Sequence, residues 1–284
     1  MSFKLKSSII GIALCTPLFY LMDTWTDVFR FLSKYGRGKG DLIYLAIAFV
    51  SSVLLTLIIQ LTSKSVKNQN VMEDELRQNG LSDRFCEVAQ KELARFGPNE
   101  MKLYHFKYLL LLTVGYARRN RIQDALNTIN RINPEIIYKR INVPSTRTMF
   151  ALQYYDAQVC ICEMMNDIGR LDNVMEAGKK LFDENAGGKD IMNKMLLDEI
   201  YSVYYAMHGE YEEAMRFADH CISLNNHTAE ICGYGFKAKI YARMGQVENA
   251  NEFIRTAESM IKNPLERQEI EDLKSFVSKL IQNS

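Results

Sequence analysis

Several positions in the C-terminal half of the chain recur after an interval of 36 residues. Each glycine in this pattern separates two runs whose apolar residues have the spacing of a helix, and small residues follow it on the buried face. Small side chains let two helices approach closely. The spacing therefore predicts successive units of two packed helices. The recurring pairs are Tyr205 and Tyr241, Gly209 and Gly245, Ala214 and Ala250, and Cys221 and Ala257.

Weaker copies of the same pattern precede these two. Their turns lie 49 and 40 residues from the next one, which indicates insertions. An irregular helical bundle without stacked repeats is the alternative interpretation. We align the earlier copies on Leu112, Thr113, Tyr116, Asn120 and Ala125, and on Ile161, Cys162, Met165, Gly169 and Val174.

The segment HGEYEEAMRFADHCISLNN, from His208 to Asn226, resembles the tetratricopeptide repeat family. Gly209 and Tyr211 match the turn of that repeat, Ala214 its second helix, and Cys221 a position near the end of that helix. The resemblance covers roughly residues 100 to 263. It implies a solenoid of antiparallel helix pairs, and a groove lined by the first helix of each pair that binds an extended peptide or a partner helix.

The resemblance also implies which residues would contact such a partner. The charged residues at the groove positions are basic at both ends and acidic in the middle. For any one of them, a solvated helix face is an equally good interpretation. The predicted partner-binding residues are Lys107, Arg118, Asp156, Glu163, Glu199, Lys239 and Arg243.

The N-terminal region contains a long apolar run, LIYLAIAFVSSVLLTLIIQL, at residues 42–61. Twenty uncharged residues in a helix extend about 30 Å, which is the thickness of the hydrocarbon core of a bilayer. We predict a transmembrane helix here. Residues 7–22 are shorter and contain Pro17, so they form either a first span or an interfacial helix.

The expected domain organisation follows from these two patterns. Residues 1–62 form a membrane anchor that contacts the bilayer through residues 7–61, residues 63–78 form a linker or helical extension, and residues 79–284 form the repeat domain. Helix-breaking residues are scarce, with 5 prolines in the chain, so the expected fold class is all-α. Pro264 begins a last amphipathic helix, which we expect to cap the final repeat with Ile270, Leu273, Phe276, Val277, Leu280 and Ile281.

Neither the cysteines nor the histidines have the spacing of a metal site or of a catalytic group. The four histidines lie in separate segments, and Cys160 and Cys162 are two apart, so they do not share a helix face. No nucleotide-binding loop or nucleophile motif is present. We therefore expect no enzyme activity, no metal and no cofactor. A formal net charge of +1 does not favour nucleic acid as a partner.

Topology is predicted from the thiols, because basic residues are almost equally divided between the two sides of a helical hairpin. Unpaired cysteines favour a reducing compartment, so we place the repeat domain on the cytoplasmic side of the membrane. Export is the alternative if only residues 42–61 span. The function that these features predict is a non-enzymatic, membrane-anchored scaffold or adaptor for a protein or peptide. The alternative is an accessory or regulatory subunit of a membrane enzyme, a transporter or a secretion or assembly system.

Overall fold

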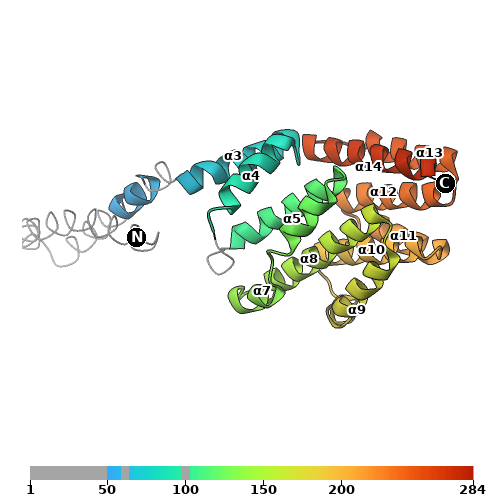
Figure 1. Cartoon of the computed structure of the whole chain (residues 1–284), viewed down its shortest axis with the longest axis horizontal. Helices are drawn as coiled ribbons and strands as arrows, with labels where there is room; N and C mark the ends of the chain where they lie inside the picture. Colours follow the sequence, from blue (N-terminus) through green and yellow to red (C-terminus); the bar gives the residue numbers. More distant parts are fainter. Residues whose placement is uncertain (1–49, 59–63, 97–102, 284) are drawn as a thin grey trace, which may run out of the picture. The chain divides into compact units, whose positions relative to one another are not determined.

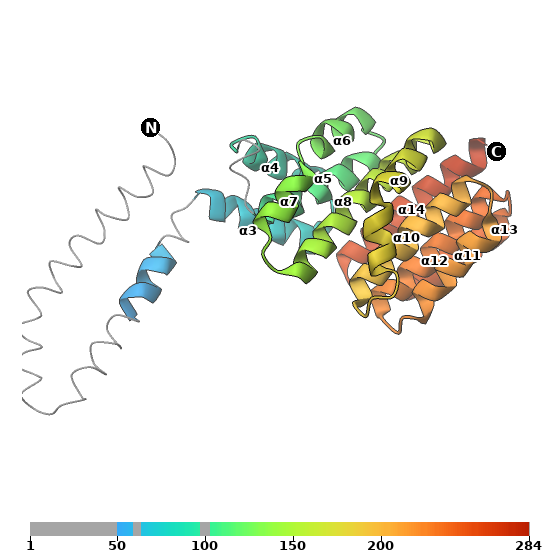
Figure 2. The same cartoon turned by 90° about the horizontal axis from the view of Figure 1, so that it is seen from below.

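A computed structural model describes residues 50–58, 64–96 and 103–283 of the chain (Figures 1 and 2). In these ranges every regular element is a helix and none is a strand, which confirms the all-α fold class. The chain divides into two compact units, residues 1–67 and residues 68–284.

The predicted membrane anchor lies mostly outside these ranges. Residues 7–22 are not among the described residues, and only residues 50–58 of the second predicted span are described. They form a helix on which Val50, Leu54 and Ile58 are exposed. Across the described part of the chain, no helix has both the length and the apolar character needed to cross a bilayer. The anchor therefore stays a prediction.

The remaining helices follow one another with short connections. In chain order they are α3 (Lys64–Asn79), α4 (Asp83–Leu93), α5 (Leu103–Arg118), α6 (Ile122–Ile129), α7 (Pro134–Arg140), α8 (Pro144–Met165), α9 (Ile168–Asn185), α10 (Ile191–Met207), α11 (Tyr211–Ser223), α12 (His227–Arg243), α13 (Val247–Ser259) and α14 (Pro264–Asn283).

The interval expected to be a linker or helical extension is helical, as part of α3. Residues 68–79 of this helix belong to the second unit. Met72 is fully buried in the core shared by α4 and α5, and Glu75 is also buried. The folded unit thus begins about one helix earlier than the boundary at residue 79 that the polar composition of this interval had indicated.

Four pairs of consecutive helices pack closely against each other: α5 with α6, α8 with α9, α10 with α11, and α12 with α13. The first helix of each pair also packs against the first helix of the next, and α14 packs against α12 and α13 (Figure 2). The extra helix α7 packs on α8 and accounts for an insertion between the first two pairs.

The same turn joins the two helices of every pair. One residue has a positive φ, and the N–H of the following residue donates to the carbonyl five positions before it. Only glycine, and next asparagine, adopts this left-handed conformation easily. The four turn residues are Asn120, Asn166, Gly209 and Gly245, and the four bonds run from Arg121 to Tyr116, Asp167 to Cys162, Glu210 to Tyr205 and Gln246 to Tyr241, at 2.9 to 3.0 Å.

This turn corrects the sequence alignment of the second pair by three residues. Gly169 lies inside α9 and is not the turn residue; Asn166, with a φ of 52°, takes that place. Leu171, and not Val174, therefore takes the place of the buried alanine found in the other pairs. Cys162, and not Met165, takes the place of the tyrosine whose carbonyl accepts the turn bond in the other pairs. The sequence alignment placed Gly169 at the turn because glycine is the usual residue there, but asparagine can adopt the same conformation.

Small residues lie where the helices of neighbouring pairs meet. Ala214, Ala218 and Cys221 on α11 are fully buried, and α12 crosses this surface. A Cβ atom added at Gly233 of α12 would lie 2.8 Å from the carbonyl oxygen of Ala218 and 2.6 Å from Ile222 Cγ1. The two helices are therefore in backbone contact at this point. Ala125, Ala250 and Ala257 are likewise fully buried in the other pairs.

Aromatic rings fill the wider spaces between the two helices of a pair. Tyr201 and Tyr205 on α10 stack on Phe217 of α11, with ring centroids 5.0 and 5.7 Å apart. One repeat later, Tyr241 stacks on Phe253 at 5.4 Å. Small residues thus lie where α11 meets α12, and aromatic rings lie between the two helices of each of the last two pairs. Together they fill the interior as close packing requires.

The last helix, α14, contacts the preceding helices through its apolar face and the side next to it. Ile270, Leu273 and Val277 are buried against α12 and α13. Phe276, expected on this same apolar face, lies instead under the ammonium group of Lys239, 5.3 Å from the ring centroid. The side of α14 next to its buried face is therefore also in contact with α12.

We predict that Gly233→Ala destabilises the fold. Its methyl group would press on the α11 backbone, and overpacking of this kind costs about 1 to 3 kcal/mol. Chemical denaturation of the full chain in detergent measures this cost. The matched control is Gly187→Ala, where an added Cβ meets no atom within 4 Å and a change within about 0.5 kcal/mol is expected. Equal stability of the two variants would contradict the close crossing.

Candidate functional site

Six of the seven predicted partner-binding residues belong to one charged cluster. They come from the first helices of successive pairs: Arg118 from α5, Asp156 and Glu163 from α8, Glu199 from α10, and Lys239 and Arg243 from α12. Direct ion pairs or the electric field of neighbouring charges couple them to one another. We call this set, together with Glu269 and Asp272 of α14, the central cluster.

Lys107, the seventh residue, lies elsewhere. It is 11 residues before Arg118 on α5, which corresponds to about 16 Å along the helix. Its ammonium group donates to Glu73 Oε1 on α3 at 2.8 Å and lies 5.6 Å from the ring centroid of Tyr108. Lys107 therefore helps to hold α3 against α5, apart from the central cluster.

Ion pairs in the central cluster join helices that are not consecutive. Lys239 Nζ on α12 donates to Glu163 Oε2 on α8 at 2.7 Å, and Arg243 Nη2 lies 3.8 Å from the other oxygen of Glu163. Helix α10 packs against both α8 and α12, so these ion pairs join the two helices on either side of it. The face formed by the first helices must therefore be strongly curved.

A second bridge joins the first pair of helices to α14. Arg118 Nη1 lies 3.8 Å from Asp272 Oδ2 and 3.9 Å from Glu269 Oε1. These two acidic residues were not among the predicted partner-binding residues, because the periodicity of α14 identifies only its apolar face. Their spacing of three residues, which puts both on one side of the helix, is the sequence feature that could have found them.

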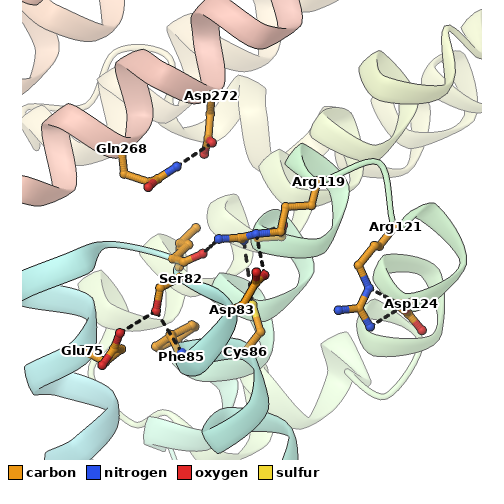
Figure 3. A network of polar contacts seen from close by, with 12 residues as sticks. Glu75, Ser82, Asp83, Phe85, Cys86, Arg119, Arg121, Asp124, Gln268 and Asp272 are labelled. Carbon is orange, nitrogen blue, oxygen red and sulfur yellow. Dashed lines mark hydrogen bonds and ion pairs between the residues drawn. The ribbon is translucent and has the colours of Figure 1, made fainter.

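Contacts around Arg119 hold the turn between α3 and α4 against the end of α5 (Figure 3). Its guanidinium donates to the carbonyl of Leu81 and pairs with Asp83 at 3.1 Å. Ser82 caps α4 by accepting from the N–H of Phe85 and donates to Glu75 at 2.7 Å. Across from this turn, Gln268 donates to Asp272 on α14, so the carboxylate that faces Arg118 is held in place.

Gly80 brings α14 close to the same turn. This glycine has a φ of +64°, and a Cβ added there would lie 2.9 Å from Gln268 Cβ. The beginning of the folded unit and its last helix are thus in direct contact beside the central cluster.

The cations of the central cluster are all in contact with carboxylates. Burial acts to lower the pKa of Arg118, but the carboxylates around it, Glu269 foremost, raise the pKa above its ordinary value. Burial likewise opposes the charge of Lys239, and Glu163 and Glu199 together raise its pKa. Both side chains therefore stay charged, with 28% and 21% of their surfaces exposed.

Two carboxylates in the middle are less well compensated. Burial, reinforced by the charge of Glu199, raises the pKa of Asp156 well above its usual range. Burial also raises the pKa of Glu199, although Lys239 and Arg118 oppose this effect. The pKa of Glu269 is raised for the same reason. The central cluster thus has more carboxylates than its cations can stabilise.

The cysteines near the cluster are poor nucleophiles. Cys160 is half-buried beside Asp156 and Glu163, and burial raises the pKa of its thiol to about 12. Cys162 is fully buried on another face of α8, in keeping with the two-residue spacing. Among the described residues, no group of three or more histidine, cysteine or acidic side chains has an arrangement suited to a metal ion.

The histidines near the pairs take part in other contacts. His220 Nδ1 lies 2.8 Å from Asp198, His208 Nε2 lies 3.1 Å from Asp172, and His227 Nε2 lies 3.5 Å from Glu266. Each of these pairs connects different helices, and none includes a residue of the central cluster. Their arrangement indicates a structural role.

Comparisons with protein-family models, with curated proteins and with solved structures found no match to this chain.

Neutralising charges in the central cluster should change stability in opposite directions, depending on the residue. Glu163 is 4% exposed and accepts from Lys239. Glu163→Gln leaves two cations without their carboxylate, so we expect a loss of about 1 to 3 kcal/mol in the free energy of unfolding. Chemical denaturation at neutral pH measures this loss. Stability equal to that of the parent would show that the bridge over α10 contributes nothing.

The double variant Asp156→Asn, Glu199→Gln should be more stable than the parent at pH 7. The folded state favours the protonated form of both groups, so the parent loses stability as the pH rises from the ordinary carboxyl range, about 4, through the raised values. The variant lacks this loss. Melting curves should differ most at neutral pH and converge near pH 4. A variant that is less stable at pH 7 would contradict the assignment.

Proposed function

We propose that this protein is a non-enzymatic, membrane-anchored scaffold whose helix pairs form a tetratricopeptide-like solenoid and bind a partner protein through the face that their first helices share. The observation that carries this proposal is the convergence of charged side chains from α5, α8, α10, α12 and α14 on one central cluster. We call the surface around the central cluster the concave face.

The succession of helices supports the solenoid. Each first helix packs against the next first helix, and all four pairs share one turn geometry. In a solenoid, each unit packs mainly on its neighbours, and a final helix covers the last unit. Helix α14 covers the last pair through its contacts with α12 and α13. It departs from a simple solenoid cap by also contacting Arg118 of α5 and Gly80.

The bridges across the concave face indicate which kind of partner fits. A helix with its side chains has a diameter of about 10 to 12 Å. Lys239 and Glu163 are in direct contact across this face at 2.7 Å, which leaves no depth for a helix at that point. An extended segment is narrower and can lie beside such a bridge. We therefore favour an extended peptide segment over a partner helix.

The predicted anchor would strengthen such binding. Confining the solenoid and its partner to one membrane surface raises their effective concentration, so a modest affinity at the concave face suffices. A scaffold of this kind needs no catalytic group, and the central cluster is built from ion pairs between helices.

Site-specific photocrosslinking in native membranes tests the proposal. A photoreactive amino acid at Glu199, on the concave face, should form an adduct with a partner protein. This position is suitable because loss of its charge is expected to be tolerated. The same amino acid at Arg216 of α11, whose side chain is 75% exposed, is the matched control and should form no such adduct.

The two positions distinguish the outcomes directly. The same adduct from both positions, or one from Arg216 alone, would contradict binding through the concave face.

A further inference from the structure

The first helices of the pairs, followed by α14, close into a ring. Each helix packs against the next in the order α5, α8, α10, α12 and α14. At the end of this series α14 returns to α5, where Arg118 faces Asp272 and Glu269. Charged groups on α10 and α14 both act on this one guanidinium. The concave face is therefore enclosed by its own helices.

The junction of α14 with α5 differs from every other junction of this ring, because it lacks an apolar core. Four apolar clusters occur among the described residues. They join α5 to α8, α8 to α10, α10 to α12, and α12 to α14. None of the four contains residues both from α14 and from α3, α4 or α5. Burial of apolar surface is the main favourable term in packing, so this junction is the weakest part of the ring.

Polar contacts form this junction, which we call the seam. Arg118 Nη1 lies 3.8 and 3.9 Å from its two carboxylates, beyond the limit of about 3.2 Å for a good hydrogen bond. Beside it, Gly80 faces α14, where Gln268 Cβ and Leu265 Cδ1 lie 2.9 and 3.6 Å from the position of an added Cβ (Figures 1 and 3). Partly exposed ion pairs contribute little to stability, and opening the seam would return their charges to water.

Two half-buried thiols lie inside the ring. Cys160 is on α8 and Cys232 is on α12, and both are within reach of the charge of Arg118. Burial raises the pKa of both thiols. Because the thiolate is the reactive form, both should react slowly with a maleimide while the ring is closed. Opening of the seam would expose them, so their reaction rates measure how often the ring opens.

We propose that the seam is the gate of the concave face. Helix α14 separates from Gly80 and from the end of α5, and an extended segment of the partner enters while the seam is open. The apolar cluster shared by α12, α13 and α14 stays intact, so α14 moves together with the last pair. This inference rests on the proposed scaffold function and adds how access to its site is controlled.

Gly80→Asn tests whether the seam opens. Asparagine tolerates a φ of +64°, so the main effect of this change is the collision of its Cβ with Gln268 Cβ. We expect Cys160 and Cys232 to react with N-ethylmaleimide about tenfold faster than in the parent. Mass spectrometry of peptides from the full chain, labelled in detergent, measures each thiol separately. Unchanged rates would overturn the opening of the seam.

The matched control for this variant is Gly209→Asn. It makes the same change at a φ of +77°, where an added Cβ meets no atom within 4 Å, and should leave both rates unchanged. Cys162, which is fully buried on another face of α8, reports on general unfolding. Acceleration of Cys162 together with the two thiols inside the ring would show that the fold is loosened throughout, and would overturn the gate.

A disulfide across the seam tests whether the gate controls binding. The bridge needs Cβ atoms about 3.5 to 4.5 Å apart, so a small shift lets Gly80→Cys, Gln268→Cys form it. Oxidation closes the seam and reduction releases it in the same protein. With the photoreactive amino acid at Glu199 in native membranes, we expect the partner adduct in the reduced form and about tenfold less of it in the oxidised form.

The outcomes separate this inference from the proposed function. Equal amounts of adduct in the oxidised and reduced forms overturn the gate and leave the scaffold proposal intact. Absence of an adduct from both forms, and also from the chain that keeps Gly80 and Gln268, contradicts the scaffold proposal and with it the role of the gate. Melting curves of each variant verify that it is folded.

Discussion

The turn between paired helices is the constraint on which the rest of the second unit depends. One left-handed residue, glycine or asparagine, lets the next N–H reach back five positions, so the second helix always leaves the first in the same direction. The residue five positions after the left-handed one, such as Ala214 after Gly209 or Ala250 after Gly245, is then buried at the contact. With the direction fixed, every first helix presents an equivalent face, and the charged residues on these faces come together.

The last two helix pairs could be predicted from the sequence because both use glycine in the turn and follow each other after 36 residues. The earlier pairs were harder to align, since Asn120 and Asn166 replace the glycine and α7 interrupts the spacing. Gly169, which lies inside α9, was therefore aligned with the turn glycines by mistake. The early start of the folded unit was missed for a different reason: α3 is mostly polar, and its burial rests on few residues, Met72 among them.

The central cluster could be predicted only in part. The resemblance to the repeat family implied which residues lie on the shared face, and six of those seven lie together, but it contains no information on how strongly the face curves. Curvature brings Lys239 to Glu163 and Arg118 to Asp272, so residues expected to contact a partner also contact each other. It also leaves Asp156 and Glu199 half-buried beside Arg118 and Lys239, whose ion pairs are with other carboxylates, and this lack of a direct partner costs folding free energy.

The protonation of these two carboxylates is the most direct measure of that electrostatic arrangement. The chain can be labelled with ¹³C at the carboxyl carbons of Asp156 and Glu199, and each titrated by NMR in the full-length protein in detergent. Titration of both groups above the ordinary carboxyl range, about 3.9 for aspartate and 4.3 for glutamate, is the predicted result. Titration of both at or below those values would show that the two groups are already paired or solvated, and would contradict an acidic centre on the concave face.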